Sequence, residues 1–408
     1  MAATINTNII SINAQRNLAL SGSSLATSMQ RLSSGLRVNS AKDDAAGLAI
    51  AERMNTQVRG LQVASRNAND GISLAQTAEG ALGKVGDMLQ RMRELSVQAG
   101  NSTNSKSDRE ALQAEVKQLS AEIDRVAKQT NFNGQKLLEG SFAGAVFQVG
   151  ANAGDNITLG ALADTRASQL ASVTYATSGT GATNLDTATM TTVDAKVSGL
   201  KITVTPPGTA VDLPDLPAAK GPQERLGQVV EAINNKSADT GVTAYLTKID
   251  GTESYKVEIM SSKLDANGDP AQVSFTGFGA TTTGIDSTVA DIAGGNTSPI
   301  RNQPGIEDID VSTQAGAWVA LKKIDSAVDQ VNSARATLGA MQSRFENAVN
   351  NIDIQSENLS AARGRIVDAD FAKETANLSR TQILQQAGTA MVAQANQIPQ
   401  QVLQLLQK

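Results

Sequence analysis

A seven-residue spacing of apolar residues at both ends of this 408-residue chain constrains its fold more than any other feature. A heptad spacing predicts a helix that buries its stripe against a partner helix, because a single helix cannot bury its own stripe. The longest such seam consists of Ile324, Val331, Leu338, Phe345, Ile352, Leu359 and Ile366. A continuous helix over this seam would be about 65 Å long. We expect Gly364 to end that helix.

The N-terminal end carries two further stripes of the same period. Gly35 and Asn39 interrupt the first stripe, and Asp43 and Asp44 suit the start of the next helix, where the helix dipole favours carboxylates. Ser107-Asp108-Arg109-Glu110 predicts a capping box that opens a third helix. The members of the two stripes are Leu18, Leu25 and Leu32, then Met54, Leu61, Ala68, Ala75, Leu82 and Leu89.

The last 40 residues predict a final helix that Asp368 or Asp370 caps. Its stripe is diluted by Ala, Ser and Gln, so we expect it to bury little surface without neighbours. Since matching stripes lie at both ends of one chain, we expect these ends to pair with each other, the inner pairing residues being Leu18, Leu25, Leu32, Leu384, Met391, Ile398 and Leu405. A plain two-chain coiled coil would leave the middle of the chain unexplained.

Proline separates the middle of the chain from its ends. Residues 1–205 contain no proline, whereas seven of the nine prolines lie within 206–299. Proline breaks helix interiors, so long helices are favoured only at the ends. Asn133-Gly134 predicts a turn that ends the preceding helical segment. Alternating apolar residues and turn signals predict strands near 201–205, 242–249, 254–259 and 273–275, hairpins at Gly150–Asn156 and Asp250-Gly251, and one helix over 224–235. The middle is therefore an inserted α+β domain with exposed Thr- and Gly-rich loops such as Thr180-Gly181 and Thr281–Gly284.

Composition argues against catalysis. The chain has no cysteine and no histidine, which removes thiol and Ser-His-Asp chemistry and most transition-metal sites. The spacing Asp265-x-Asn267-x-Asp269 starts like a calcium loop, but proline replaces the expected glycine, so a plain turn is favoured. Asp368-x-Asp370 is favoured as a helix cap rather than a cation site. We expect no enzyme activity, no cofactor and no metal.

Charge and hydropathy limit the partners. The net charge is −5, and residues 176–299 alone carry 8 basic and 14 acidic side chains. No basic stripe is present to hold phosphates, and no apolar run approaches the roughly 18 residues of a membrane helix. We therefore expect neither a nucleic-acid nor a membrane partner. The first ten residues carry no positive side chain, so we expect no cleaved secretory signal.

Several motifs are long enough to carry a family resemblance. They are RLSSGLRVNSAKDDAAG at 31–47, ASRNANDGIS at 64–73, TNFNG at 130–134, FQVGAN at 147–152, QILQQAG at 382–388 and AQANQ at 393–397. In these motifs the chain resembles bacterial flagellin, the subunit of the flagellar filament. The likeness covers roughly residues 1–175 and 300–408.

The resemblance implies a mainly α fold: a long antiparallel coiled-coil or bundle rod built from both chain ends, with an inserted α+β outer domain. It implies three domains. Residues 1–43 plus 365–408 would form the inner filament core, 44–175 plus 300–364 the helical rod with a β-hairpin region, and 176–299 the variable surface insert. The rod-helix seam would be Ile324, Val331, Leu338, Phe345, Ile352 and Leu359.

The resemblance also implies a function and partners. The chain would self-assemble into the filament for swimming. Because the stripes at both ends are diluted by Ala, Ser and Gln, we expect residues 1–40 and 370–408 to be largely disordered in the monomer. The chain would be exported unfolded by a type III route to the outside of the cell. Partners would be the chain itself, an export chaperone at the C-terminal helix, cap and hook-junction proteins, and a host Toll-like receptor of innate immunity. By motif, the receptor-binding positions are Arg91, Leu95 and Glu115.

Other functions remain possible at this point. A hook–filament junction protein shares the pattern at both chain ends, although the close match along both ends favours the filament. A filament subunit whose insert adds adhesion is a second alternative. The ordinary structural interpretation of Arg91 and Glu115 is a pair of solvated helix charges, with Leu95 in the core.

Overall fold

The computed structural model describes residues 8–177, 190–205, 208–248, 254–265, 270–285 and 300–406. The chain divides into two compact units. The terminal unit comprises residues 1–71, 146–157 and 344–408, and the central unit comprises 72–145 and 158–343.

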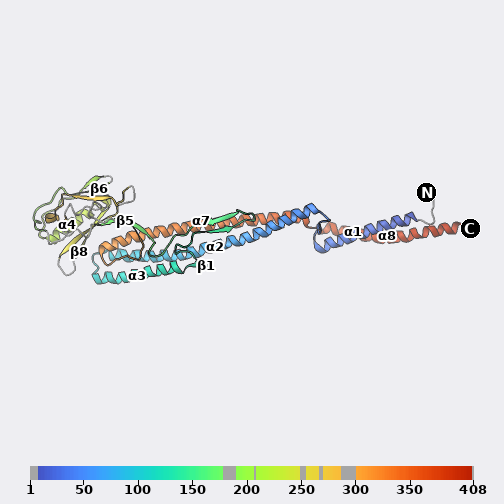
Figure 1. The fold of residues 1–408 in the computed structure, drawn as a ribbon, viewed down its shortest axis with the longest axis horizontal. Coiled ribbons are helices and arrows are strands. Elements are labelled where there is room, and N and C mark those ends of the chain that lie inside the picture. Colours follow the sequence, from blue (N-terminus) through green and yellow to red (C-terminus); the bar gives the residue numbers. More distant parts are fainter. Residues whose placement is uncertain are drawn as a thin grey trace. The chain divides into compact units, whose positions relative to one another are not determined.

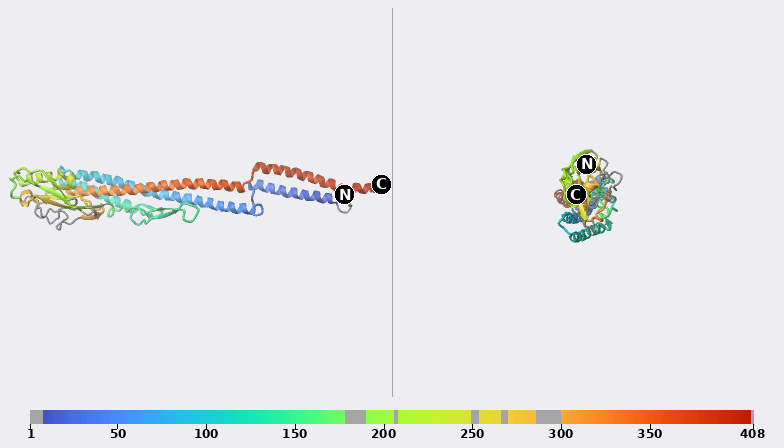
Figure 2. Two further views of the ribbon diagram at one scale, coloured as in Figure 1. Left: turned by 90° about the horizontal axis from the view of Figure 1, so that it is seen from above. Right: turned by 90° about the vertical axis from the view of Figure 1, so that its left-hand side faces the viewer.

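Two antiparallel helices from the opposite ends of the chain form one part of the terminal unit. They are α1 (Ile9–Ser34) and α8 (Phe371–Leu406), which lie side by side (Figures 1 and 2). Helix α1 ends at Gly35, whose φ of 72° is left-handed and whose N–H returns to the Arg31 carbonyl. Helix α8 starts after Asp370, whose Oδ1 accepts hydrogen bonds from the N–H groups of Ala372 and Lys373. The prediction that Asp368 or Asp370 caps this helix is confirmed for Asp370.

The two connectors beside this helix pair are bonded to each other. The Arg37 N–H donates to the Val367 carbonyl at 2.7 Å, and the Ala369 N–H donates to the Gly35 carbonyl at 2.9 Å. We call residues 35–38 and 366–369 the clasp. Val38 and Val367 are buried in it. The clasp therefore ties the end of α1 to the start of α8.

Helix α7 (Gln314–Val367) continues past Gly364, so the prediction that this glycine ends it was wrong. The Gly364 carbonyl accepts a helical hydrogen bond from the Asp368 N–H at 2.8 Å. A glycine inside a helix costs about 1 kcal/mol relative to alanine, which a helix this long tolerates. The helix ends instead where the Val367 carbonyl turns to the clasp.

Helix α2 (Ala45–Ala99) begins at Asp44, whose Oδ1 accepts from the Gly47 N–H at 2.8 Å. Asp43 closes the preceding loop instead. Its Oδ2 accepts from the Ser40 hydroxyl and from the Asn39 and Ser40 N–H groups, and these hydrogen bonds lower the pKa of Asp43. The two neighbouring aspartates therefore have separate roles.

A predicted hairpin of the terminal unit is confirmed. Strands β3 (Ala145–Gln148) and β4 (Asn156–Leu159) form a two-stranded sheet. Beside it, Leu61, Ala64 and Ile352 form a small apolar cluster that joins α2 to α7.

In the central unit, α3 (Lys106–Gln129) lies along α2 and α7 (Figure 1). The sequence predicted a capping box that starts at Ser107, but the box starts at Ser105. The Ser105 hydroxyl accepts from the Asp108 N–H, while the Asp108 carboxylate accepts from the Ser105 N–H and hydroxyl. An aspartate therefore takes the place that the motif rule gives to glutamate.

Turn chemistry fixes the hairpin after α3. Strands β1 (Asn131–Phe132) and β2 (Gln135–Lys136) pair across Asn133 and Gly134, which have φ of 50° and 81°. Positive φ at both central positions is the geometry that an Asn-Gly turn supplies.

Residues 172–304 form two antiparallel sheets, of which β5 and β11 lie mostly or wholly outside the predicted insert of 176–299, and the insert has a separate apolar core. Its longest helix is α4 (Pro222–Asn234), and its strands at 201–205, 242–248, 255–261 and 272–276 match the predicted ones. The sheet orders are β11-β5-β9-β8 and β10-β6-β7. The remaining elements are β5 (Ser172–Thr177), β6 (Lys201–Thr205), β7 (Thr209–Asp212), α5 (Ser237–Thr240), β8 (Val242–Lys248), β9 (Tyr255–Ser261), β10 (Gln272–Thr276), α6 (Ala280–Thr283) and β11 (Ile300–Pro304).

Some predicted loops can be placed and others cannot. Thr281–Thr283 form part of the short helix α6 instead of an open loop, and Thr283 is buried. The Thr180-Gly181 and Asp250-Gly251 turns, and the centre of the calcium-like spacing at 266–269, lie outside the described residues.

One fully buried arginine connects three segments of the insert. Arg225 of α4 donates to the carbonyls of Val193 and Ala195 at 2.5 and 2.6 Å and to the Pro217 carbonyl at 2.8 Å. Burial lowers the pKa of Arg225. The helix is thereby anchored to two segments that precede it in the chain, at 193–195 and at Pro217.

The predicted fold class is confirmed, since long helices from both ends pair and a β-containing insert lies between them. The predicted boundaries of the three domains stay predictions.

Candidate functional site

The α1–α8 pair exposes an unusual amount of apolar surface. Large apolar side chains gathered on an exposed face mark an interaction surface. Fifteen such side chains are exposed in the described residues, and nine of them lie on these two helices: Ile9, Ile10, Ile12, Leu20, Met29, Phe371, Ile383, Leu384 and Met391.

The seam between α1 and α8 is polar and small, in contrast to that outer surface. The side chains buried in it are Ser11 and Ser28 from α1 and Glu374, Thr381 and Ala395 from α8. The helices approach closely at Gly388, where an added Cβ would lie 3.1 Å from Leu18 Cδ1. The pair therefore buries little apolar area, and burial of apolar area is the main term that holds helices together.

Polar contacts mark the two ends of this pair. At one end, Asn8 Nδ2 donates to the Ala395 carbonyl at 2.8 Å, and the Ser11 hydroxyl donates to Asn396 Oδ1 at 2.7 Å. At the other end, beside the clasp, Arg31 Nη1 lies 3.3 Å from Glu374 Oε1. The opposite orientation of the helices follows from these contacts.

The predicted inner pairing residues are only partly brought together. Leu18, Leu25 and Leu32 are half-buried against α8, whereas Leu384 and Met391 are 49% and 63% exposed. Ile398 and Leu405 lie in α8, and their side chains are outside the described residues. Their role in packing between subunits stays a prediction.

Sequence reasoning missed the face of α8 that is buried in the single chain. This face repeats every seven residues and consists of Glu374, Thr381, Gly388 and Ala395. Its last three positions each lie three residues before a position of the predicted apolar stripe, so that Thr381 precedes Leu384. A search that also accepted small and polar residues at heptad spacing would have found this face.

A groove of about 530 Å³ runs beside the seam. Leu18 and Ile10 line it from α1, and Leu384, Gly388 and Met391 line it from α8. Four of the nine exposed apolar residues, Ile9, Ile10, Leu384 and Met391, line this groove. We call the exposed apolar surface of the two helices, together with the groove, the terminal surface.

The rod-helix seam lies inside the chain. Five of its six predicted residues are buried and Leu359 is half-buried; the buried ones are Ile324, Val331, Leu338, Phe345 and Ile352. Side chains with so little exposure have no area left for a partner.

The three residues implied as receptor contacts lie together on α2 and α3. Arg91 Nη2 is 2.8 Å from Glu115 Oε1, and Arg91 Nη1 is 3.0 Å from Glu94 Oε2. The hydrogen bond to Glu115 raises the pKa of Arg91, while Leu95 is buried. The geometry is that of a half-exposed ion pair above a core leucine.

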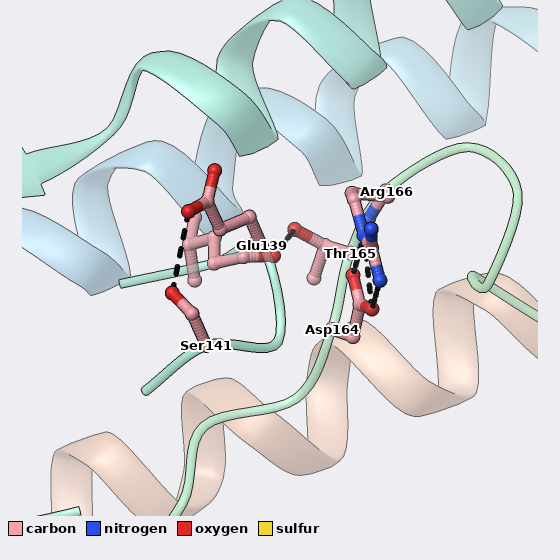
Figure 3. Close-up of polar contacts among 6 residues, drawn as sticks. Glu139, Ser141, Asp164, Thr165 and Arg166 are labelled. Carbon is pink, nitrogen blue, oxygen red and sulfur yellow. Dashed lines mark hydrogen bonds and ion pairs between the residues drawn. The ribbon is translucent and has the colours of Figure 1, made fainter. Parts of the chain in front are cut away.

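A second polar cluster closes the loop after β4 (Figure 3). Arg166 forms a two-pronged pair with Asp164 at 2.6 to 3.1 Å, and the buried Thr165 hydroxyl donates to the Leu138 carbonyl. Ser141 donates to Glu139 nearby. Burial raises the pKa of Asp164, but the Arg166 hydrogen bonds outweigh it and hold the pKa below its usual value of 3.8. All these contacts brace a loop.

The described residues hold neither a membrane-spanning helix nor a metal-binding cluster. None of their helices is both long enough and apolar enough to span a membrane. In the same residues, no three His, Cys, Asp or Glu side chains are grouped so that they are able to hold a metal ion.

Comparison with known proteins gives the chain a family context. The model of the bacterial flagellin N-terminal helical region matches residues 5–143, and that of the C-terminal helical region matches residues 321–406. Flagellin C of Vibrio cholerae is 40% identical over 410 residues, and polar flagellin C of Vibrio parahaemolyticus is 39% identical over 418 residues; each alignment covers 100% of both chains. The solved structure of FliC from Burkholderia pseudomallei aligns with 67% of this chain and 99% of its own, at 26% identity and a TM-score of 0.38.

Proposed function

Since this chain belongs to the bacterial flagellin family, whose members are structural filament subunits and not enzymes, we propose that the terminal surface is where its subunits polymerise. The observation that carries this proposal is the gathering of exposed apolar side chains on α1 and α8. In water such a surface is unfavourable, and contact with other copies removes it from water.

The contact between copies is heterologous. A filament grows when one face of a subunit binds a different face of the next and the rotation does not close. In this arrangement residues 1–43 and 365–408 line the filament core, 44–175 and 300–364 form the rod around it, and 176–299 face outward. The net charge of −6 in the insert favours that outward position.

Folding of α1 and α8 is coupled to assembly. Their seam of Ser, Thr, Gly and Ala supplies little apolar burial, so in the free monomer the pair is largely unfolded. Neighbouring copies complete the core by covering the terminal surface. Polymerisation is thereby avoided until the subunits meet at a growing end.

The same property suits export. We assign the chain to the filament outside the cell, reached unfolded through a type III channel without a cleaved signal. A chain without disulfides is compatible with such passage. A chaperone would cover α8 before export, and the cap and hook-junction proteins would meet the same terminal surface during assembly.

The receptor assignment rests on family resemblance and on one local arrangement. Arg91 and Glu115 form an ion pair whose side chains are 49% and 44% exposed, so a partner has access to both in the monomer. Leu95 beneath them supports the helix packing. An Arg91→Ala monomer should signal more weakly through a host Toll-like receptor, and undiminished signalling would contradict the assignment.

Seeded growth tests the central proposal. Purified monomer is mixed with short filament seeds, and elongation is followed by light scattering and electron microscopy. Intact monomer should extend the seeds, whereas chains that lack 1–40 or 370–408 should not. Growth by both truncated chains would overturn the proposal. Intact monomer that caps seeds without extending them would indicate a junction protein.

Limited proteolysis tests the coupled folding. Protease should trim α1 and α8 from the free monomer and leave both in the filament. A monomer fully protected at both ends would contradict coupling, even if the filaments grow normally.

A further inference from the structure

We propose that the ion pair of Arg31 and Glu374 sets the register of α1 against α8 as a subunit joins the filament. The inference rests on the proposed function of the terminal surface and adds how one alignment of the two helices is selected.

The seam itself specifies register weakly. Ser11 and Ser28 on α1 meet a row of Glu374, Thr381, Gly388 and Ala395 on α8, spaced by seven. Sliding one helix by a heptad would place similar small side chains opposite each other again. Large interlocking apolar side chains normally oppose such slips, and α8 buries none here in its described side chains.

Glu374 is the only acidic residue in the sequence of either helix. The other charged residues are Arg16, Arg31, Lys373 and Arg380. The Glu374 side chain is 9% exposed, and that of Arg31 is 31% exposed. One carboxylate among four cations, buried at one point of the seam, therefore gives the pair a unique reference position.

A heptad slip would break this contact at a high cost. Glu374 would then lie opposite Ser24, with its carboxylate buried and without a cation. A buried charge that loses its partner is strongly unfavourable, whereas the intact pair adds little net stability. The pair thus acts on the choice of alignment more than on the strength of association, as buried polar residues do in coiled coils.

The contact also leaves room for a closer form. It is a single contact of 3.3 Å, and among the described residues neither Arg31 Nε nor Glu374 Oε2 has a hydrogen-bond partner, although both atoms are buried. A small rotation of the two side chains would make a two-pronged pair that satisfies both atoms. We infer this closer form for the assembled subunit.

The position of the pair beside the clasp decides when it acts. The Ala369 N–H donates to the Gly35 carbonyl across the clasp. Arg31 lies one helical turn before Gly35, and Glu374 lies five residues after Ala369. The loop to be closed there is short, so this contact forms at a low entropic cost. Register is therefore set at the clasp, and pairing extends from it toward the two chain ends.

Disulfide trapping measures register directly, because the chain has no cysteine. Leu18→Cys with Gly388→Cys reports the native register, and Leu18→Cys with Thr381→Cys reports the slip of one heptad that would bring Glu374 opposite Ser24. In filaments grown from the otherwise unchanged chain, only the first pair should cross-link within one subunit. In a R31M/E374M background both should cross-link to a comparable degree.

Charge reversal gives an independent measurement. R31E and E374R should each slow seeded elongation by about tenfold or more, and the double variant should recover to within about threefold of the parent rate. K373E changes the net charge as much as R31E does at an exposed site, and it should keep the native cross-link. A double variant as slow as the single ones would overturn the proposal.

The register inference and the proposed function of the terminal surface can fail separately. If R31M/E374M filaments show only the native cross-link, the register inference is wrong while polymerisation through the terminal surface stands. If the truncated chains of the seeding experiment extend seeds, the terminal surface itself is dispensable and the proposed function fails first.

Discussion

Phe345 of α7 stacks edge-to-face on Phe147 of β3, with ring centroids 5.3 Å apart and planes at 86°. The tip of the Phe345 ring also covers Gly71 of α2, where an added Cβ would lie 2.8 Å from Cζ. One fully buried ring thus joins two helices and the hairpin. The glycine is required there by the close approach of the ring.

Gly71→Ala should destabilise the protein by about 1–3 kcal/mol, because the new methyl group forces the Phe345 ring out of its place. Urea unfolding followed by circular dichroism measures the change. Gly80→Ala is the matched control in the same helix, since nothing lies within 4 Å of its added Cβ. It should stabilise by about 0.5–1 kcal/mol. Equal effects of the two substitutions would contradict the close contact.

Ser105→Ala should cost about 1 kcal/mol of stability, because it removes the hydroxyl that caps α3. Ser107→Ala should be nearly neutral, since Ser107 lies inside the helix. Each substitution deletes one serine hydroxyl, and the two sites are two residues apart. The melting temperatures of the two variants, measured by thermal unfolding, compare the losses. A larger loss for Ser107→Ala would favour the capping box predicted from sequence.

Arg225→Met should loosen the insert and leave the helical rod intact. Three carbonyls would lose their donor, and that of Val193 is buried, so we expect a total cost of about 2 kcal/mol or more. Amide hydrogen exchange in α4 and β6 should accelerate, while exchange in α2 and α7 should not change. Lys220→Met, at an exposed site nearby, is the control. Unchanged exchange in α4 would show that the arginine is not an anchor.

Asp164→Asn should flatten the acid part of the stability profile. The folded-state pKa of Asp164 lies below its ordinary value of 3.8, so its contribution is present above that pH and is lost as pH falls through the folded pKa. We expect about 1 kcal/mol or less, because the pair is partly solvated. Urea midpoints across the acid range measure it. The control is Asp329→Asn, which changes an exposed carboxylate in the same way. This variant should keep the dependence of stability on pH that the parent protein shows in the acid range.

Apolar periodicity made the long rod helix predictable from the sequence. Every residue from Ile324 to Ile352 at seven-residue spacing is large and apolar, and all are buried. The strands of the insert followed from alternation and turn residues for the same reason. Where burial is achieved by large apolar side chains, the pattern is visible without a structure.

The site was less predictable because its buried seam lacks such side chains. On α8 the apolar residues Leu384 and Met391 are exposed, and Glu374 and Thr381 are buried. Hydropathy ranks these pairs in the reverse order. The arrangement makes sense for a subunit whose apolar surface serves its neighbours, and a single sequence does not state which partner an apolar stripe will meet.

Helix ends were predictable to within a few residues. Asp370 starts α8 as expected, whereas Gly364 does not stop α7, and the capping box of α3 is displaced by two residues. Capping depends on which of several nearby polar side chains reaches a free N–H group. Small differences in backbone geometry decide this, and the residue type alone does not.

Arg225 binds oxygen atoms that belong to the main chain at positions 193, 195 and 217. Every amino acid supplies such an oxygen, so the anchor places no demand on which side chains those positions carry. A network of side chains would have tied the three positions to particular residue types. The insert is therefore free to drift in sequence at these points without losing its shape. Such drift would be an advantage if the insert faces outward from the filament, as we propose.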